Sequence, residues 1–325
     1  MIDAQSTELK WSKLRSLVIG DLNVDVIVSG APQLPVLGHE IPCEDVQTVM
    51  GGAASIFACR LAQLGSEVDI LGKIGADVNG DISLKNLRSS GVGTGKVKVL
   101  DDFKTGVTIS LTYQKNRALV TYMKGFDSLT GADIDPKIFA EYNHLHISSI
   151  YILRNFISSV SAVFSEAKKR GLTTSLDTNA DPLNKYAYVD DILGHVDIFF
   201  PNDKEAKAIT KTGSVHAALE RLSAKVPMVV IKRGGKGAMG RHDGKTVKVK
   251  PYSIKPVDTT GAGDCFDAGF VYSFLHKKRN FKESVEFANA LGALSCLYVG
   301  GAEKRLRETD VQAFVAQRRM AVKKE

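Results

Sequence analysis

Strands and helices are expected to alternate in the second half of the chain, and this alternation constrains the fold more than any other feature. From residue 143 onward, the apolar segments short enough to be buried strands are HLHISSIYI, TTSLDTN, VDIFFPN and PMVVIKRGG. The segments between them have the apolar spacing of helices, and these are FISSVSAVFSEAKKRG, DKEAKAITKTG and HAALERLSA. Strands that alternate with helices favour a parallel sheet covered on both faces. We therefore predict an α/β fold.

The first half of the chain begins in the same way. Residues 16–21 form an apolar segment typical of a strand, and 67–75 (EVDILGKIG) form a second one. Between them, 51–65 (GGAASIFACRLAQLG) has a helical stripe of apolar residues with glycines at both ends. Residues 79–92 indicate another helix that a glycine ends. These segments extend the predicted α/β pattern toward the N-terminus.

A smaller sheet is predicted from segments that alternate with period two. Polar and apolar residues alternate in 24–29 and 46–50, and again in 105–123 on both sides of a turn at 114–117. A period of two is typical of strands with one buried face, and the turn indicates a hairpin. We expect these strands to form a small sheet that projects from the α/β body.

The remaining segments complete one domain. After a strand pair that follows the PMVVIKRGG segment, two apolar helices at 264–276 and 283–298 are predicted to close the fold. We expect a single domain over residues 1–325, with the small sheet inserted at about 24–50 and 100–124.

The positive charge of the chain does not indicate a nucleic-acid partner. Lys and Arg number 43 against 36 Asp and Glu, which gives a net charge of +7. Such an excess could favour nucleic acid or an anionic small molecule. Much of it lies in 276–282 and 318–324, without the interleaved aromatic residues of a base-stacking surface. We interpret these segments as solvated helix faces or a tail.

Cysteine spacing and hydropathy favour a reduced, cytoplasmic protein. The four cysteines are scattered without a C-x-x-C pair, so a structural zinc site or a disulfide framework is not expected. The first residues, MIDAQSTELKWSK, lack the charged-then-apolar order of a signal peptide. No apolar run approaches the ~18–20 residues that span a bilayer, and no membrane partner is expected.

Two glycine-rich segments imitate nucleotide motifs. Residues 91–97 (GVGTGKV) resemble a phosphate-binding P-loop, but Ser90 replaces its first glycine and no hydroxyl residue follows the lysine. Residues 235–240 (GKGAMG) match G-x-G-x-x-G, but the segment after them is typical of a strand, whereas the dinucleotide motif opens a helix. Neither segment supports its usual function.

The segment VDTTGAGDCFDAGF, residues 257–270, carries the strongest chemical signal. Gly261, Ala262 and Gly263 stand where an apolar helix begins, and Asp264 follows them. The first amides of a helix have no internal partner and attract anions, and small residues allow an anion to approach them. A helix-capping role would explain Asp264 but not the Gly-Ala-Gly run. A carboxylate beside an anion hole suits phosphoryl transfer.

This segment resembles the C-terminal signature of the PfkB/ribokinase family of carbohydrate and nucleoside kinases. Other segments resemble features of the family in the same order over essentially the whole chain, and these are GDLNVD (20–25), GGAASIFACRLAQLG (51–65), PNDKEA (201–206), KRGGKGA (232–238) and ANALGALSC (288–296). The resemblance implies a ribokinase-like fold, with a central, mostly parallel sheet flanked by helices and a small β-sheet lid. It also implies transfer of the γ-phosphate of ATP, with Mg²⁺, to a hydroxyl of a sugar or polyol.

The resemblance also implies roles for individual residues. Asp264 would be the general base, and Gly261, Ala262 and Gly263 would form the anion hole for the γ-phosphate. The substrate-binding residues would be Asn23, Asp25, Gly51 and Gly52. The ATP-binding residues would be Asn202, Glu205, Lys232, Gly234, Gly237 and Asn289. Glu205 would act on Mg²⁺ through water, and Asp258 and Thr260 stand where several relatives hold a monovalent cation such as K⁺.

Several of these residues have simpler structural explanations. Asp25 suits a solvent-facing position in a hairpin, and N-x-x-E suits an ordinary helix start with an acidic first turn. Asn289 suits a satisfied polar group in a core. Asp177 and Asn179 follow a predicted strand, where open α/β sheets bind ligands, and are further site candidates.

The sequence departs from the family at Ile56, where many relatives have an asparagine that contacts the sugar. A less polar pocket is therefore expected, which suits a sugar other than ribose, a polyol or a nucleoside. The hairpin with Tyr113, Arg117 and Tyr122 would be the lid or a homodimer surface. A nucleoside kinase, or a regulator that binds nucleotide without turnover, remains an alternative to a sugar kinase.

Overall fold

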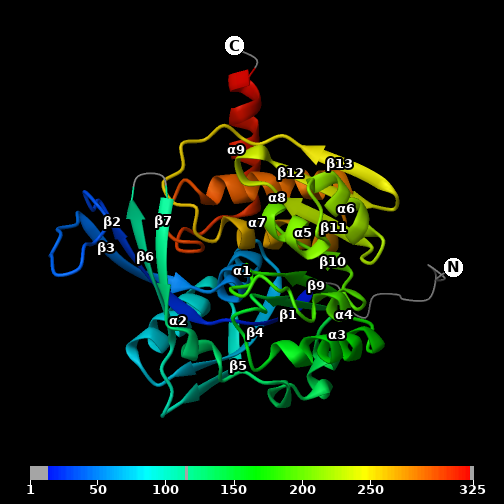
Figure 1. The fold of residues 1–325 in the computed structure, drawn as a ribbon. Coiled ribbons are helices and arrows are strands. Elements are labelled where there is room, and N and C mark those ends of the chain that lie inside the picture. Colours follow the sequence, from blue (N-terminus) through cyan, green and yellow to red (C-terminus); the bar gives the residue numbers. More distant parts are fainter. Residues whose placement is uncertain (1–13, 114–115, 323–325) are drawn as a thin grey trace.

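A large sheet forms the centre of the molecule. The computed structural model describes residues 14–113 and 116–322, and for 116–117 and 319–322 the backbone alone (Figure 1). Within these residues the nine strands lie in the order β13 (Lys245–Val249), β12 (Ala238–His242), β11 (Met228–Lys232), β10 (Ile198–Phe199), β9 (Thr173–Asp177), β8 (His144–Ser148), β1 (Arg15–Ile19), β4 (Glu67–Gly75) and β5 (Gly93–Leu100). Neighbours from β11 to β5 pair in parallel, and β12 and β13 add an antiparallel edge. The mostly parallel sheet predicted from the sequence is confirmed.

Helices cover both faces of this sheet. One hydrophobic cluster packs with α1 (Ala53–Gln63), α2 (Val78–Ser90), α7 (Ala262–Val271), α8 (Phe281–Ser295) and α9 (Glu308–Val322). The other packs with α3 (Val160–Lys169), α4 (Val189–Leu193), α5 (Asp203–Thr210) and α6 (Val215–Ser223). Along β1, Val18 faces the first cluster while Leu17 and Ile19 face the second. Strands buried on both faces explain the nearly continuous apolar segments of the sequence.

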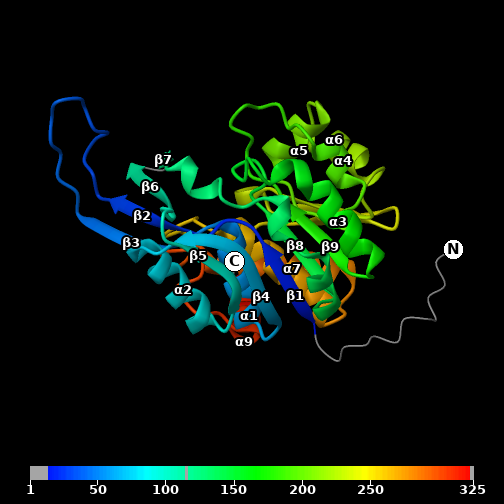
Figure 2. The same ribbon diagram turned by 90° about the horizontal axis from the view of Figure 1, so that it is seen from below.

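A second sheet stands apart from the first. Its strands lie in the order β3 (Asp45–Gly51), β2 (Asn23–Ser29), β6 (Gly106–Tyr113) and β7 (Asn116–Thr121). In both views these strands extend to one side of the body (Figures 1 and 2). The small sheet predicted from the period-two segments is therefore confirmed, including the pairing of β6 with β7.

Shorter helical turns connect these elements. They are the 3₁₀ turns Met123–Phe126, Gly131–Asp133, Pro136–Glu141, Ile157–Ser159 and Gly234–Lys236, and a π-helical turn, Tyr272–His276, that extends α7. The segment 235–240 thus leads into strand β12, as the sequence predicted. No helix in the described ranges is long and apolar enough to cross a membrane.

Helix α4, strand β5 and helix α9 were not predicted. Strand β5 covers part of the glycine-rich segment 91–97, and it lies at the edge of the large sheet, where lysines alternate with Val97 and Val99. Two helices were expected to close the fold, but a third, α9, follows them. Its buried residues Val311 and Phe314 join the first hydrophobic cluster. Among its described side chains only Val311 and Phe314 are buried, which gives too faint a periodicity to indicate the helix.

Candidate active site

Helix α7 begins in a tightly packed loop of small residues. Gly261 is its N-cap, with a left-handed φ of 69°, and no side chain caps this end within the described ranges. A Cβ on Gly261 would lie 2.7 Å from the Cα of Gly301 and 2.9 Å from the Cδ1 of Ile56. The Ala262 N–H donates to the Thr259 carbonyl at 3.3 Å, whereas the Gly263 amide lies in the first turn and has no intrahelical acceptor. The Gly263 N–H therefore stands at a helix start that no described side chain caps.

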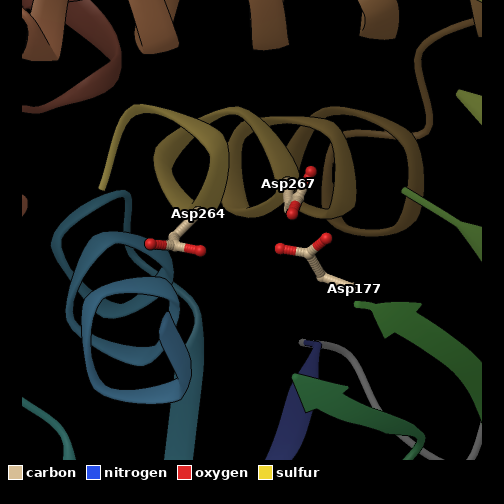
Figure 3. A group of neighbouring side chains, drawn as sticks. All are labelled: Asp177, Asp264 and Asp267. Atoms are coloured by element: carbon tan, nitrogen blue, oxygen red, sulfur yellow. The ribbon is translucent and has the colours of Figure 1, made fainter. Parts of the chain in front are cut away.

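Three carboxylates meet beside this helix start. Asp264 and Asp267 lie one turn apart on α7, and Asp177 is the last residue of β9. One oxygen of each lies within 4.8 Å of the others, and Figure 3 shows the three groups gathered beneath α7. Asp267 is fully buried, whereas Asp264 keeps partial access to solvent.

The side chain of Lys232 joins this cluster from the end of β11. Its Nζ lies 2.9 Å from Asp177 Oδ1 and 2.8 Å from Asp267 Oδ2. The side chain is 12% exposed, so both ion pairs are shielded from water. Within the cluster, Lys232 supplies the positive charge that balances part of the carboxylate charge.

The electrostatics of the site favour a proton acceptor that works near neutral pH. Withdrawal from water, and then the charge of Asp177, raise the pKa of Asp264 to about 7, while Lys232 opposes the shift. Asp21 and Asp25 raise it further. A carboxyl group with a pKa near the operating pH is suited to general-base catalysis.

The predicted substrate residues lie together at the start of the small sheet. Asn23 pairs with Gly51 across β2 and β3, and the Nδ2 of Asn23 donates to Asp25 Oδ1 at 3.1 Å. The buried Oδ1 of Asn23 has no hydrogen-bond partner among the described residues. Gly52 has a φ of 88°, and a Cβ there would lie 2.6 Å from the carbonyl oxygen of Asp21. The strand predicted at 24–29 begins one residue earlier, at Asn23, which pairs with both β3 and β6.

Asp21 is a site residue that sequence reasoning missed. Its carboxylate accepts hydrogen bonds from the backbone N–H groups of Ala53 at 3.0 Å and Ala54 at 3.1 Å. It therefore fixes the start of α1 against the end of β1 and holds Gly52 in place. An aspartate directly after a buried strand was the available signal.

A cavity of about 910 Å³ lies against the N-terminal end of α7. Ala262 and Gly263 form part of its wall, together with all six residues predicted to bind ATP, which are Asn202, Glu205, Lys232, Gly234, Gly237 and Asn289. Asp177 lines it too, but Asn179 is not part of the wall and instead accepts a hydrogen bond from the Tyr151 N–H at 2.9 Å. The volume suits a ligand of nucleotide size.

Asn202 and Glu205 cap helix α5 reciprocally. Asn202 Oδ1 accepts from the Glu205 N–H at 2.9 Å, and Glu205 Oε2 accepts from the Asn202 N–H at 2.9 Å. The helix-start explanation of N-x-x-E therefore describes the geometry, although both residues also face the cavity. Burial, and then the charge of Asp177, raise the pKa of Glu205 to about 7.

The other predicted residues also have structural partners. Asp258 Oδ1 accepts from the Thr260 hydroxyl at 2.8 Å, and Asp258 Oδ2 accepts from the Gly300 N–H at 3.0 Å. The Nδ2 of Asn289 donates to the Lys250 carbonyl at 3.0 Å, which fits the expectation of a satisfied polar group.

Ile56 and the hairpin residues differ in exposure. Ile56 is 2% exposed and packs against Gly261 and Gly301, so it supports the loop before α7. Tyr122 is 41% exposed, and Tyr113 is half-buried in β6. The side chain of Arg117 lies outside the described part of the chain.

A helix start that no described side chain caps, a carboxylate beside it and a nucleotide-sized cavity suit phosphoryl transfer. The model of the pfkB family carbohydrate kinases matches residues 13–308. The chain belongs to this family, whose members are ATP-dependent phosphotransferases that act on hydroxyl groups.

Relatives and solved structures agree with this assignment. An uncharacterized sugar kinase of Archaeoglobus fulgidus is 30% identical over 252 residues, which cover 76% of this chain and 97% of that protein. A ribokinase of Haemophilus influenzae is 26% identical, covering 86% of this chain and 90% of the relative. The crystal structure of a putative ribokinase II from E. coli in complex with ATP and Mg²⁺ has a TM-score of 0.83 at 24% identity, covering 94% of this chain and 99% of that one. The structural likeness shows the fold alone.

Proposed function

We propose that this kinase transfers the γ-phosphate of ATP to a hydroxyl of a sugar or polyol, with Asp264 as the general base. One observation carries the proposal. Asp264 lies in the first turn of α7, directly after Ala262 and Gly263 in the wall of the 910 Å³ cavity, and the charge of Asp25 on β2 acts on its carboxyl group. A base at this position would act between ATP in the cavity and an acceptor bound near Asp25.

The cavity is proposed to bind ATP. The backbone N–H groups of Ala262 and Gly263 would donate to the γ-phosphate, and Gly261 would allow its close approach. Gly234, Gly237 and Asn289 would line the rest of the nucleotide site. The charge of Asp177 acts on Glu205, and Mg²⁺ bound through water at these carboxylates would neutralise charge on the phosphates.

The acceptor would bind at the start of β2. The unpartnered Oδ1 of Asn23 is a buried acceptor that a substrate hydroxyl would satisfy, and the Asp25 carboxylate is a second acceptor beside it. Gly51 and Gly52 carry no side chain that would block the approach of a sugar. The Asp264 carboxylate would then take the proton from the attacking hydroxyl as the oxygen bonds to phosphorus.

A panel of acceptors tests this proposal. We expect ATP turnover, followed through ADP release, to be fastest with one of the sugars or polyols in a panel that also contains nucleosides. Preference for adenosine, inosine or cytidine would favour the nucleoside-kinase alternative. Background activity on every acceptor, together with tight ATP binding, would favour a regulator that binds nucleotide without turnover.

Two further features of the proposal concern the loop before α7 and the small sheet. Asp258 and Thr260 would hold a monovalent cation, which predicts faster turnover in K⁺ than in a tetramethylammonium salt. The small sheet would act as a lid over the acceptor, because β2 carries Asp25 toward the site. Its other face would contact a second copy of the chain.

A further inference from the structure

The ammonium group of Lys232 is enclosed by carboxylates from two other elements. It pairs with Asp177 at the end of β9 and with Asp267 on α7, both within 3 Å and both shielded from water. Burial alone would lower the pKa of Lys232, but Asp177 and then Asp267 raise it above its ordinary value. Lys232 therefore stays charged at any pH at which the protein works.

The same ammonium group lies beside the start of α7. A Cβ placed on Gly263 would be 3.4 Å from the Lys232 Nζ, which puts this charge next to the residue before Asp264. Four carboxylates act on Asp264. They are Asp177 on β9, Asp267 on α7, Asp21 in the loop after β1 and Asp25 on β2. On α1, which also packs against α7, Arg60 donates to the carbonyls of Gly301 and Lys304.

We propose that Lys232 is a positioning residue whose buried ammonium offsets the neighbouring carboxylate charges, so that a substantial fraction of Asp264 is ionised, and able to accept a proton, at neutral pH. This inference rests on the proposed role of Asp264 and changes the role that the family resemblance gives to Lys232. Because both ion pairs already engage the ammonium, its side chain serves the carboxylate cluster rather than the nucleotide. Without it, a buried group of like charges would retain protons.

The first experiment measures the protonation of Asp264 without using catalysis. The carboxyl carbons of ¹³C-labelled aspartate are titrated by NMR in the full chain, and the Asp264→Asn variant assigns the signal. We expect Lys232→Met to raise the pKa of Asp264 by about one unit or more, and Lys232→Arg to leave it near the wild-type value. An unchanged pKa in Lys232→Met would overturn the proposal.

Lys73→Met is the matched control. Lys73 is 14% exposed and pairs with Asp133 at 2.7 Å, so its removal breaks an equally shielded ion pair away from the cluster. We expect no change in the pKa of Asp264. Asp267→Asn is a second test, which remains available if Lys232→Met does not fold. We expect it to lower the pKa of Asp264, because it removes a neighbouring negative charge. A rise in this variant would also contradict the proposal.

ATP affinity separates the two roles of Lys232. Calorimetry with ATP should give similar dissociation constants for the wild type and Lys232→Met. A loss of affinity of about tenfold or more, with the Asp264 titration unchanged, would make Lys232 a nucleotide ligand instead. With the best acceptor of the panel, the acidic limb of the pH–rate profile should move to higher pH in Lys232→Met. Retained turnover in Asp264→Asn would refute the proposed function and leave the NMR result intact.

Discussion

At Asp264, the burial that prepares the carboxyl group for catalysis also costs the fold stability. An ionised carboxylate near Asp177 is held among like charges, and its pKa of about 7 records that cost. A buried carboxylate that lowers the stability of the fold is typical of a functional site rather than of a structural one. Two predictions follow from the two sides of this balance.

The first prediction concerns turnover. Asp264→Asn preserves the shape of the side chain but removes the base, so kcat should fall about 10²–10⁴-fold while ATP affinity changes little. Steady-state kinetics and calorimetry with ATP measure the two effects. Asp243→Asn, in the exposed turn between β12 and β13, is the control and should retain full turnover. Near-normal turnover in Asp264→Asn would refute the mechanism.

The second prediction concerns stability and its pH dependence. The pKa of Asp264 is raised from 3.8 to about 7 on folding, so between these values the folded state holds a proton that the unfolded state has released. Stability therefore falls as the pH rises through this window, and the full cost is present above pH 7. Asparagine cannot ionise, and Asp264→Asn should raise the free energy of unfolding by about 1–3 kcal/mol at pH 8. Urea denaturation at pH 5 and pH 8 should show a smaller gain at pH 5, and an equal gain at both would contradict the argument.

At the residue scale, the sequence predicts groups that are adjacent in the chain, but not the contacts between residues that the fold brings together. Asp264 and its glycines are adjacent in the chain, so their pattern was visible in one segment. The groups that meet at Asp267 are far apart in the chain, because Lys232 comes from β11 and Asp177 from β9. Their meeting depends on strand order, which no single segment encodes.

At the scale of elements, the start of α7 depends on close packing between three segments. Gly261 touches Ile56 on α1 and Gly301 in the loop after α8, and its positive φ disfavours any side chain. The Cys265 thiol donates to the Gly301 carbonyl at 3.1 Å, and the Arg60 guanidinium donates to it at 2.7 Å. The loop after α8 therefore fixes the geometry of the proposed anion hole.

The third prediction separates backbone strain from packing at this helix start. Gly261→Ala should lower the free energy of unfolding by about 3 kcal/mol or more, because the methyl group meets backbone and Ile56 in addition to the strained φ. Gly91→Ala is the control, since Gly91 has a φ of 90° with nothing within 4 Å of an added Cβ, and it should cost about 1 kcal/mol. Thermal or urea denaturation measures both, and equal losses would show that packing at Gly261 contributes nothing.

The elements themselves were predictable where periodicity was strong. Buried strands such as β11 are continuous apolar segments, and α1 is bounded by glycines. The edge strand β5 alternates lysine with valine on a solvated side, and α9 buries few residues, so neither stands out from its surroundings. The unpredicted elements are those whose stability comes from neighbours rather than from their own sequence.

At the scale of the whole molecule, the two faces of the small sheet have different chemistry. Asp25, Thr108 and Thr121 are directly opposite one another across β2, β6 and β7, and therefore share the face that carries Asp25. Val26, Ile109 and Val120 are opposite one another in the same way and lie on the other face. At these positions the face that carries Asp25 is polar and the opposite face is apolar.

The fourth prediction is that this apolar face holds two copies of the chain together. Ile109 is 45% exposed and Val120 is 69% exposed, which is unfavourable for β-branched side chains aligned across adjacent strands unless another surface covers them. We expect the wild-type protein to sediment as a dimer and Val120→Lys to sediment as a monomer, because a charge at the centre of an apolar interface is not paired. Val99→Lys, at a 51% exposed position on β5 of the large sheet, should leave the dimer intact. A wild-type monomer at every concentration, or a dimer that survives Val120→Lys, would place the apolar face in a different role, such as packing against the body when the lid closes.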